Sequence, residues 1–339
     1  MNIQENISLK PYNTFQIDKK ARFFIEVESV HEIKETLQYA REQNLPVLIL
    51  GGGSNVLLTK DVFALVIKIS IKGIEVLKED DSHVWVKAGA GEVWHDFVLH
   101  TISHQWAGVE NLSLIPGTVG ASPMQNIGAY GIEIKEVFDH LEAINRDSLE
   151  TVKIDKETCK FGYRDSIFKN VARDQYIITH VVYRLSKKPT FNVSYGAIRS
   201  TLENMGHQES SYSLKHISDA VIKIRQEKLP DPKKLGNAGS FFKNPILTKA
   251  QFEQLKRDYP TIPFYPQENG VKVPAAWLLE MAGWKGKTFG DVGVHKNQPL
   301  VLVNYGNGDG EAIKALSEKI QRDIKEKFNI HLYPEVNFI

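Results

Sequence analysis

Cysteine is nearly absent from this sequence, since its 339 residues include only Cys159. A single thiol excludes an internal disulfide, and no second cysteine or histidine cluster completes a metal site with it. We therefore expect a reducing, cytoplasmic environment. Long hydrophobic runs are also missing. No stretch approaches the roughly 18 apolar residues of a membrane span, and the first ten residues lack the apolar core of a signal peptide, so we expect neither export nor membrane insertion.

An excess of charge of one sign is missing as well. Lys and Arg total 42 and Asp and Glu total 41, which gives a net charge of +1. This balance removes the overall basic field of non-specific nucleic-acid binding, so we expect no nucleic-acid partner. Hydrophobic residues (42%) and charged residues (24%) are present in the proportions of a folded globular protein. At roughly 150 residues per domain, the length predicts two or three domains.

The spacing of apolar residues predicts a mixture of strands and helices. Expected strands cover residues 23–27, 47–50, 64–68, 84–88, 139–144, 176–185 and 299–304, and a last strand ends at residue 339. Expected helices cover residues 30–43, 92–104, 249–257, 274–281 and 311–328, and one more carries Leu214, Ile217, Val221 and Ile224 on one face. That helix ends at the Leu229-Pro230-Asp231-Pro232 segment, where we place the last domain boundary.

Two glycine-rich segments are candidates for ligand contact. Gly51-Gly52-Gly53-Ser54-Asn55 directly follows an expected strand, and its backbone N–H groups can approach a phosphate closely. It matches neither G-x-G-x-x-G nor G-x-x-x-x-G-K-[ST], so a Rossmann or P-loop site is excluded and a plain tight turn remains the alternative.

The second candidate, residues 116–131, is turn-rich and nearly free of charge. Gly117, Gly120, Gly128 and Gly131 let its backbone wrap a flat ligand, while Ser122, Gln125, Asn126 and Tyr130 supply hydrogen-bonding groups. The alternative is a loop that lines the core, which is less favourable because its backbone groups need partners.

Three further side chains could carry chemistry. Arg164, in Phe161-Gly162-Tyr163-Arg164-Asp165-Ser166, suits a bidentate grip on a carboxylate, although a salt bridge to Asp165 is the simpler interpretation. Ser240 lies between glycine and aromatic residues. No general base is evident near it, so it suits proton donation better than nucleophilic attack, and loop capping is the alternative.

The third side chain is Glu335. Its proline and apolar neighbours favour the neutral carboxyl that a general acid needs, although an exposed glutamate at a sheet edge is the commoner case. His100 and His104 share a helical face, but no third ligand is evident and no metal site is expected.

Five ordered blocks resemble the UDP-N-acetylenolpyruvoylglucosamine reductases, the MurB family of bacterial peptidoglycan precursor synthesis. They are ILGGGSNVLL (49–58), IPGTVGASPMQNIGAYG (115–131), FGYRDSIFK (161–169), KLPDPKKLGNAGSFFKNP (228–245) and the closing PEV. The resemblance extends from Leu9 to Val336. The segment Ser194-Tyr195-Gly196 looks like the tyrosine-bearing loop of the longer, type I form of this family.

The resemblance implies an α+β FAD-binding fold of the vanillyl-alcohol-oxidase type with an added C-terminal α/β substrate-binding domain. FAD-binding subdomain 1 would cover residues 1–70 with the strand 330–339 returning near the active site, subdomain 2 would cover 71–229, and the third domain 230–329. The implied FAD contacts are Gly51, Gly52, Gly53, Ser54, Asn55, Pro116, Gly117, Gly120, Ala121, Ser122, Gln125, Asn126, Gly128, Ala129 and Tyr130.

The resemblance also implies UDP-N-acetylmuramate dehydrogenase activity, in which NADPH reduces FAD and hydride then passes from flavin N5 to C3 of UDP-N-acetylglucosamine enolpyruvate. Arg164 and a protonated Glu335 would stabilise the enolate, and Ser240 would protonate C2. The implied substrate contacts are Tyr195, Lys228, Asn244 and Gln298. We expect a monomer.

Two other functions remain open at this stage. A non-catalytic protein that binds flavin or a nucleotide sugar would keep the cofactor loops, but it would have no need of Arg164, Ser240 and Glu335, which count against this function. A related flavin oxidase would not need NADPH, and the GNAGSFFKNP block would have no role in it.

Overall fold

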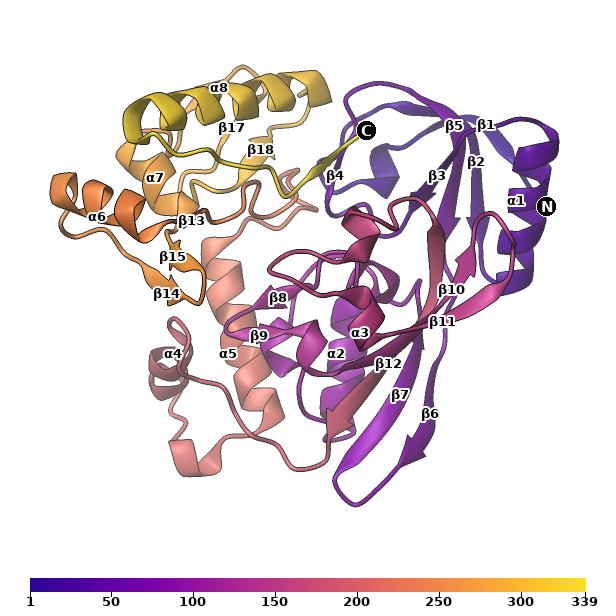
Figure 1. The fold of residues 1–339 in the computed structure, drawn as a ribbon, viewed down its shortest axis with the longest axis horizontal. Coiled ribbons are helices and arrows are strands. Elements are labelled where there is room, and N and C mark those ends of the chain that lie inside the picture. The colour runs from indigo at the N-terminus through magenta and orange to yellow at the C-terminus, as the bar shows by residue number, and fades with distance from the viewer. The chain divides into compact units, whose positions relative to one another are not determined.

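The computed structural model describes all residues from 1 to 339, and the chain divides into two compact units (Figure 1). Unit 1 comprises Met1–Ile7, Ala21–Gly53 and Phe63–Glu227, and unit 2 comprises Ser8–Lys20, Ser54–Val62 and Lys228–Ile339. Each unit is therefore assembled from three stretches of chain. The finer division into two FAD-binding subdomains and a third domain stays a prediction.

One sheet of four strands holds the first part of unit 1. Its order is β1 (Gln4–Ser8), β2 (Lys20–Val27), β5 (Val62–Ile69) and β3 (Val47–Leu50), and β3 runs parallel to β5. Helix α1 (Val30–Glu42) begins at Ser29, whose side chain accepts the Glu32 N–H, and lies beside this sheet in Figure 1. It buries Ile33, Leu37 and Ala40 in the same core as the strands.

A second sheet of unit 1 is antiparallel throughout. Its order is β11 (Thr151–Asp155), β10 (Phe138–Asn145), β12 (Tyr176–Ser186), β7 (His83–Gly89) and β6 (Ile74–Glu79). Helix α2 (Trp94–Ser103) brings Trp94 and Phe97 against Tyr183 of β12, with ring centroids 5.9 and 4.8 Å from that of Tyr183. These aromatic contacts hold the N-terminal end of α2 against the sheet.

Shorter elements complete unit 1. They are α3 (Lys156–Cys159), α4 (Ile198–Asn204), α5 (Leu214–Lys228), the ribbon of β8 (Gly128–Ala129) and β9 (Ile132–Glu133), and 3₁₀ turns at 110–112, 119–121, 134–136, 167–169 and 209–211. Helices α4 and α5 share a small core that includes Leu202, Ile217 and Val221. Figure 1 shows the β8–β9 ribbon beside α5.

Unit 2 contains three small sheets and three helices. The sheets are β13 (Ile246–Leu247), β15 (Gly270–Lys272) and β14 (Tyr265–Gln267); β16 (Thr288–Phe289), β17 (Val292–Val294) and β18 (Leu302–Asn304); and the parallel pair β4 (Val56–Leu57) and β19 (Asn337–Phe338). The helices are α6 (Lys249–Asp258), α7 (Ala275–Met281) and α8 (Gly310–Phe328), and a 3₁₀ turn covers residues 10–12. Helix α8 packs on β17 and β18 (Figure 1).

The predicted helices and strands are confirmed, with ends that shift by a few residues. The predicted strand 299–304 shortens to β18, since residues 298–301 form the turn that leads into it. The sequence analysis did not predict helices α3 and α4 or eleven of the strands, of which all but β6 have only two to five residues. In β6, five of the six residues are exposed, so the strand lacks the half-buried pattern that marks other strands. No helix combines the length and apolar character that crossing a membrane requires.

Candidate functional site

The two glycine-rich segments meet in unit 1. Gly51–Gly53 follows β3, and a Cβ added at Gly52 would lie 3.0 Å from the Cα of Gly117. A Cβ at Gly51 would lie 2.9 Å from the Thr118 hydroxyl oxygen. The two backbones are therefore as close as glycine permits, and their N–H groups are gathered in one place. This is the kind of backbone cradle that suits a phosphate or diphosphate.

The loop at 117–120 is fastened to the chain that leads into α2. The Gly117 carbonyl accepts the Trp94 N–H at 3.0 Å, and the Gly120 N–H donates to the Ala90 carbonyl at 2.9 Å. A Cβ at Gly120 would lie 2.5 Å from the Ala90 Cβ, a contact that real Cβ atoms do not make. Gly120 is therefore required for packing whether or not a ligand is bound.

Two of the predicted cofactor residues have side chains that serve the protein itself. The Ser122 hydroxyl is buried against the Tyr183 hydroxyl at 2.7 Å. The fully buried Asn126 amide donates to Glu133 and to the Gly162 carbonyl, both at 3.0 Å, and accepts the Lys135 N–H. Any contact of these residues with a cofactor would use their backbone. Pro116 is exposed and Ala121, Gln125 and Ala129 are partly exposed.

Arg164 lies on a tight turn in which Gly162 and Asp165 exchange backbone hydrogen bonds. Its own backbone is left-handed (φ +54°), and its guanidinium donates to the Gly128 carbonyl. The Asp165 carboxylate accepts from Asn170. The structure thus brings Arg164 against the β8 end of the predicted cofactor segment.

Tyr195 lies beside the same end of that segment. A Cβ at Gly131 would lie 3.3 Å from the Tyr195 Cβ, and the Tyr195 side chain is 40% exposed.

Asn111 contacts the same region. Its Nδ2 donates to the backbone carbonyls of Tyr130 at 3.2 Å and Asn192 at 2.8 Å, whereas its Oδ1 is buried without any hydrogen-bond donor.

Sequence reasoning missed one charged group here. Arg225, on α5, donates from Nε to the Leu114 carbonyl at 3.2 Å and hydrogen-bonds the Tyr130 side chain. Burial raises the pKa of Tyr130 and lowers that of Arg225. His95 accepts the Leu114 N–H at 3.0 Å, and burial holds its pKa below the ordinary value. The sequence analysis considered only the apolar face of this helix, and no motif marks Arg225.

Ser240 and Glu335 are brought together in unit 2. The Phe241 N–H donates to the Leu300 carbonyl and the Glu335 N–H donates to the Phe241 carbonyl, both at 2.8 Å. Residues 240–242 therefore run between the turn before β18 and the C-terminal segment. The Ser240 side chain is exposed and forms no hydrogen bond within the chain, so its hydroxyl is available to a ligand.

The C-terminal segment also reaches the loop before β4. The Asn55 Nδ2 donates to the Glu335 carbonyl at 3.1 Å, and the Asn337 N–H donates to the Asn55 carbonyl at 3.0 Å. A residue predicted to contact FAD and a residue predicted to be catalytic are thus adjacent in unit 2. Ser54, which opens this stretch, is partly exposed.

The remaining predicted substrate residues lie in three parts of the chain. Lys228 is exposed at the last position of α5. The Asn244 Oδ1 accepts the Ala275 N–H at 2.9 Å, which caps α7. Gln298 is half-buried in the turn between β17 and β18, where its backbone N–H donates to the His295 Nδ1 at 3.3 Å.

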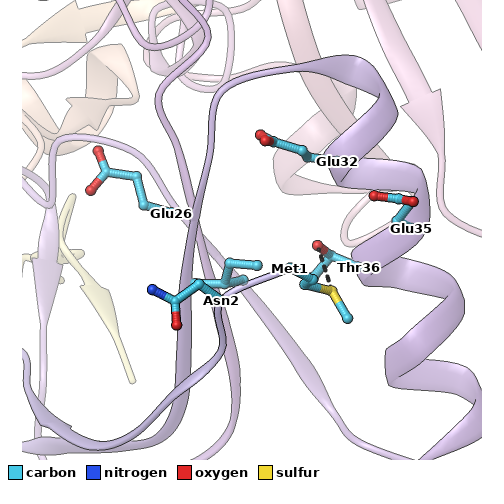
Figure 2. A pocket seen from close by; sticks show the side chains of 7 residues that line it. Met1, Asn2, Glu26, Glu32, Glu35 and Thr36 are labelled. Carbon is cyan, nitrogen blue, oxygen red and sulfur yellow. Dashed lines mark hydrogen bonds between the residues drawn. The ribbon is translucent and has the colours of Figure 1, made fainter.

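A cavity of about 320 Å³ in unit 1 involves none of these residues. Glu26, Glu32 and Glu35 line it together with Met1, Asn2, Ile25 and Thr36 (Figure 2). The Glu32 carboxylate is already used by the Glu28 N–H, and the Glu26 carboxylate by Lys68 and Ser70. Nowhere does the chain gather three or more His, Cys, Asp or Glu side chains in a way that could hold a metal ion.

The comparisons first define a class of protein. Residues 21–151 match an FAD binding domain, and this span includes both glycine-rich segments. The contact between Gly52 and Gly117, together with the unpaired Asn111 Oδ1, fits such a cofactor. The chain is therefore an FAD-binding flavoprotein, as predicted.

Residues 231–339 match the C-terminal domain of UDP-N-acetylenolpyruvoylglucosamine reductase. Proteins named UDP-N-acetylenolpyruvoylglucosamine reductase from Flavobacterium johnsoniae and Pseudomonas aeruginosa are 56% and 47% identical to the chain; the alignments cover 100% and 99% of it and of each relative. This chain belongs to the UDP-N-acetylenolpyruvoylglucosamine reductase family, and the predicted family is confirmed.

Solved structures agree on the fold. The crystal structure of the reductase from Thermus caldophilus is 22% identical, with a TM-score of 0.67 over 100% of this chain and 99% of the other. That of 6-hydroxy-D-nicotine oxidase from Arthrobacter nicotinovorans is 12% identical, with a TM-score of 0.53 over 96% and 85%. The predicted α+β FAD-binding fold with an added C-terminal domain is confirmed.

Proposed function

We propose that this protein catalyses the NADPH-dependent, FAD-mediated reduction of UDP-N-acetylglucosamine enolpyruvate to UDP-N-acetylmuramate, a step of peptidoglycan precursor synthesis. The proposal rests on 56% identity to a relative named UDP-N-acetylenolpyruvoylglucosamine reductase over its full length, together with the match of residues 21–151 to an FAD binding domain. NADPH and a UDP-sugar are the co-substrates, which is why we propose a cytoplasmic location. A monomer stays our expectation.

FAD would be held by the two glycine-rich segments. Gly51–Gly53 and Gly117–Thr118 would receive its diphosphate, because their touching backbones gather N–H donors where side chains are excluded. Residues 121–130 would line its ring system through backbone and small apolar side chains, since the polar side chains of Ser122 and Asn126 are already satisfied. When bound, FAD supplies the hydride transfer from NADPH to C3 of the enolpyruvyl group.

Ser240 would protonate C2. Its hydroxyl is exposed and forms no hydrogen bond within the chain, and the backbone of the next residue, Phe241, is held by hydrogen bonds to Leu300 and Glu335. A hydroxyl is a weak acid in water, but it stays protonated at neutral pH, and a fixed position next to a basic enolate carbon compensates for its weak acidity.

Arg164 and Glu335 would stabilise the charge that builds up on the substrate carboxylate. The Arg164 guanidinium is already oriented by the Gly128 carbonyl, so little reorganisation is needed when that charge develops. The Glu335 backbone is fixed by hydrogen bonds on both sides, from its N–H to Phe241 and from Asn55 to its carbonyl.

Four residues would recognise the nucleotide sugar. Tyr195 and Lys228 are exposed, and a phenol and an ammonium group suit a diphosphate. Asn244 would use its Nδ2, because its Oδ1 caps α7, and Gln298 would use the amide at its half-buried turn.

The test is a two-step anaerobic titration of the purified protein loaded with FAD. We expect NADPH to bleach the flavin and the enolpyruvyl substrate to restore its colour, with one UDP-N-acetylmuramate formed per flavin. A flavin that NADPH bleaches but that only oxygen reoxidises would contradict the proposed reaction and favour an oxidase. A protein that takes up no FAD would contradict the proposal at its first step.

A further inference from the structure

Glu335 lies on a bend between two paired stretches of unit 2. Before the bend, Pro334 forms a β-bridge with Phe242, and after it β19 pairs in parallel with β4. Residues 335 and 336 form the bend itself. A side chain on a bend is directed by both of its flanks, so the direction of the Glu335 carboxyl depends on how firmly each flank is held.

The second flank is the shorter of the two. The first is held beside Ser240, where the Glu335 N–H donates to the Phe241 carbonyl at 2.8 Å. In the second, β19 and β4 pair over two residues each, and Asn55 attaches its beginning through the Glu335 carbonyl at 3.1 Å. A parallel pair of this length is held weakly by its own backbone hydrogen bonds. The far end of this flank, at Ile339, therefore needs a further attachment.

Thr59, two residues beyond β4, supplies that attachment. Its N–H and its hydroxyl both donate to the Ile339 backbone oxygen, at 2.7 and 2.8 Å. The Ile339 N–H donates in turn to the Leu57 carbonyl at 3.0 Å, and Figure 1 shows this end of the chain close to β4. Thr59 is buried, so water competes little for its hydroxyl. The end of the C-terminal segment is thus held through both its N–H and its oxygen.

Helix α8 gives Thr59 a rigid support. Its first residue, Gly310, lies so close to the chain after β4 that an added Cβ would clash with the Leu58 carbonyl oxygen and lie 3.1 Å from the Thr59 Cα. The Asp309 side chain fixes this end of the helix by accepting the Glu311 N–H. A continuous series of contacts therefore runs from α8 through Thr59 to the segment that carries Glu335.

We propose that Thr59 is a positioning residue for the reaction: its hydroxyl fixes the end of the C-terminal segment and thereby the direction of the Glu335 carboxyl. The inference rests on the proposed function, in which Glu335 stabilises the charge that builds up on the substrate carboxylate. Reduction of the flavin by NADPH precedes that step and does not use Glu335. Thr59 therefore affects only the half-reaction with the enolpyruvyl substrate.

The test measures both half-reactions of the FAD-loaded protein and of Thr59→Val. Valine keeps the shape of the side chain and the backbone N–H but lacks the hydroxyl. A misplacement of about 1 Å can cost about 10²-fold in rate, and the backbone hydrogen bonds of the segment remain, so we expect reoxidation by the enolpyruvyl substrate to slow by about tenfold. Bleaching by NADPH should stay normal. Thr59→Ser, which keeps a hydroxyl, should restore reoxidation.

Thr179→Val is the matched control. Thr179 is fully buried in unit 1, and its hydroxyl also donates to a backbone oxygen, the Glu142 carbonyl, at 3.0 Å. Its loss should leave both half-reactions unchanged. A further comparison places Thr59→Val in a Glu335→Ala background. There the substitution should slow reoxidation no further, because no carboxyl remains to be positioned.

Normal reoxidation in Thr59→Val would overturn the inference. Equal slowing of both half-reactions would also overturn it, as would an effect of the same size in the Glu335→Ala background. If Thr59→Val does not fold, Asn337→Ala decides, because Asn337 is exposed and its Nδ2 attaches the same segment to the Asn55 carbonyl at 3.1 Å. Normal reoxidation in that variant would contradict the proposal. A wild-type protein that fails in either half-reaction would instead count against the proposed function.

Discussion

The two units present their proposed functional residues in opposite ways. In unit 1, Asn126, Tyr130 and Arg164 all have left-handed backbones (φ +45°, +51° and +54°) within loops. In unit 2, Ser240 forms a β-bridge with Val301, the Glu335 N–H donates to the Phe241 carbonyl, and the Ser240 side chain is exposed. The first arrangement depends on many buried polar contacts, whereas the second depends on the register of a few backbone hydrogen bonds.

Because of this difference, we expect substitutions at the two kinds of site to affect folding stability and reaction rate differently. A loop held by buried side-chain hydrogen bonds loses both its shape and its ligand when one of these side chains is removed. A side chain that projects from an extended segment into solvent contributes little to folding, so its removal affects the reaction alone. The comparison therefore predicts that substitutions of Ser240 change rates alone, whereas substitutions of the buried polar residues of unit 1 change stability and FAD binding together.

The largest effect is expected for Ser240→Ala. Loss of the proton donor should slow turnover by about 10³-fold, while the free energy of unfolding changes by less than about 0.5 kcal/mol. Stopped-flow absorbance should show normal bleaching of the flavin by NADPH and failure of its reoxidation by the enolpyruvyl substrate. Ser240→Cys keeps an ionisable hydrogen at this position and should retain more activity than Ser240→Ala. Equal loss of both half-reactions would show that Ser240 does not act as the proton donor.

Asn126→Ala tests the opposite behaviour in unit 1. It leaves the Gly162 carbonyl and the Lys135 N–H without their buried partner, so unfolding in urea should become easier by about 2–3 kcal/mol. FAD affinity should fall with it, because the loop that Asn126 holds contains most of the proposed cofactor residues. Asn170→Ala is the matched control, since Asn170 is exposed, and it should cost less than about 1 kcal/mol. A stable variant that binds FAD normally would contradict the prediction that the buried polar residues of unit 1 support folding and FAD binding together.

The sequence predicted six of the eight helices and eight of the nineteen strands, because the buried faces of these elements leave a periodic apolar pattern. It also located Gly51–Gly53 and residues 116–131 as a possible ligand site, because close backbone approach demands glycine at intervals. Arg225 and Asn111 were missed for a physical reason. Arg225 hydrogen-bonds Tyr130 and Leu114, and Asn111 donates to the Tyr130 carbonyl, and contacts between residues this far apart in the sequence become visible only in the folded chain.

Asn244 has a double role that two substitutions can separate. Asn244→Ala removes the oxygen that caps α7 and should lower the unfolding free energy by about 1 kcal/mol, together with a higher KM for the nucleotide sugar. Asn244→Asp keeps an oxygen for the Ala275 N–H, so stability should be preserved, but its negative charge opposes an anionic diphosphate and should raise the KM further. Thermal melts and steady-state kinetics measure the two effects. A normal KM in both variants would remove Asn244 from the substrate site.

The smallest effect is expected for the pH dependence of stability that Glu110 adds to unit 1. Burial raises the pKa of this carboxyl, and the Gly108 N–H, at 2.7 Å, offsets part of the rise. A raised pKa means that the folded state prefers the neutral form of the carboxyl. The contribution of Glu110 to stability is therefore fully present below its ordinary pKa of 4.5 and is lost as the pH rises through the raised value.

The variant Glu110→Gln tests this dependence, because it keeps an acceptor for the Gly108 N–H but cannot ionise. Its stability relative to the wild-type protein should therefore increase as urea unfolding is repeated from pH 4.5 to pH 8, and a difference that stays constant over this range would show that the buried carboxyl does not titrate there. The Ser240→Ala variant should follow the wild-type curve throughout, because the unit 2 hydroxyl neither titrates nor supports the fold.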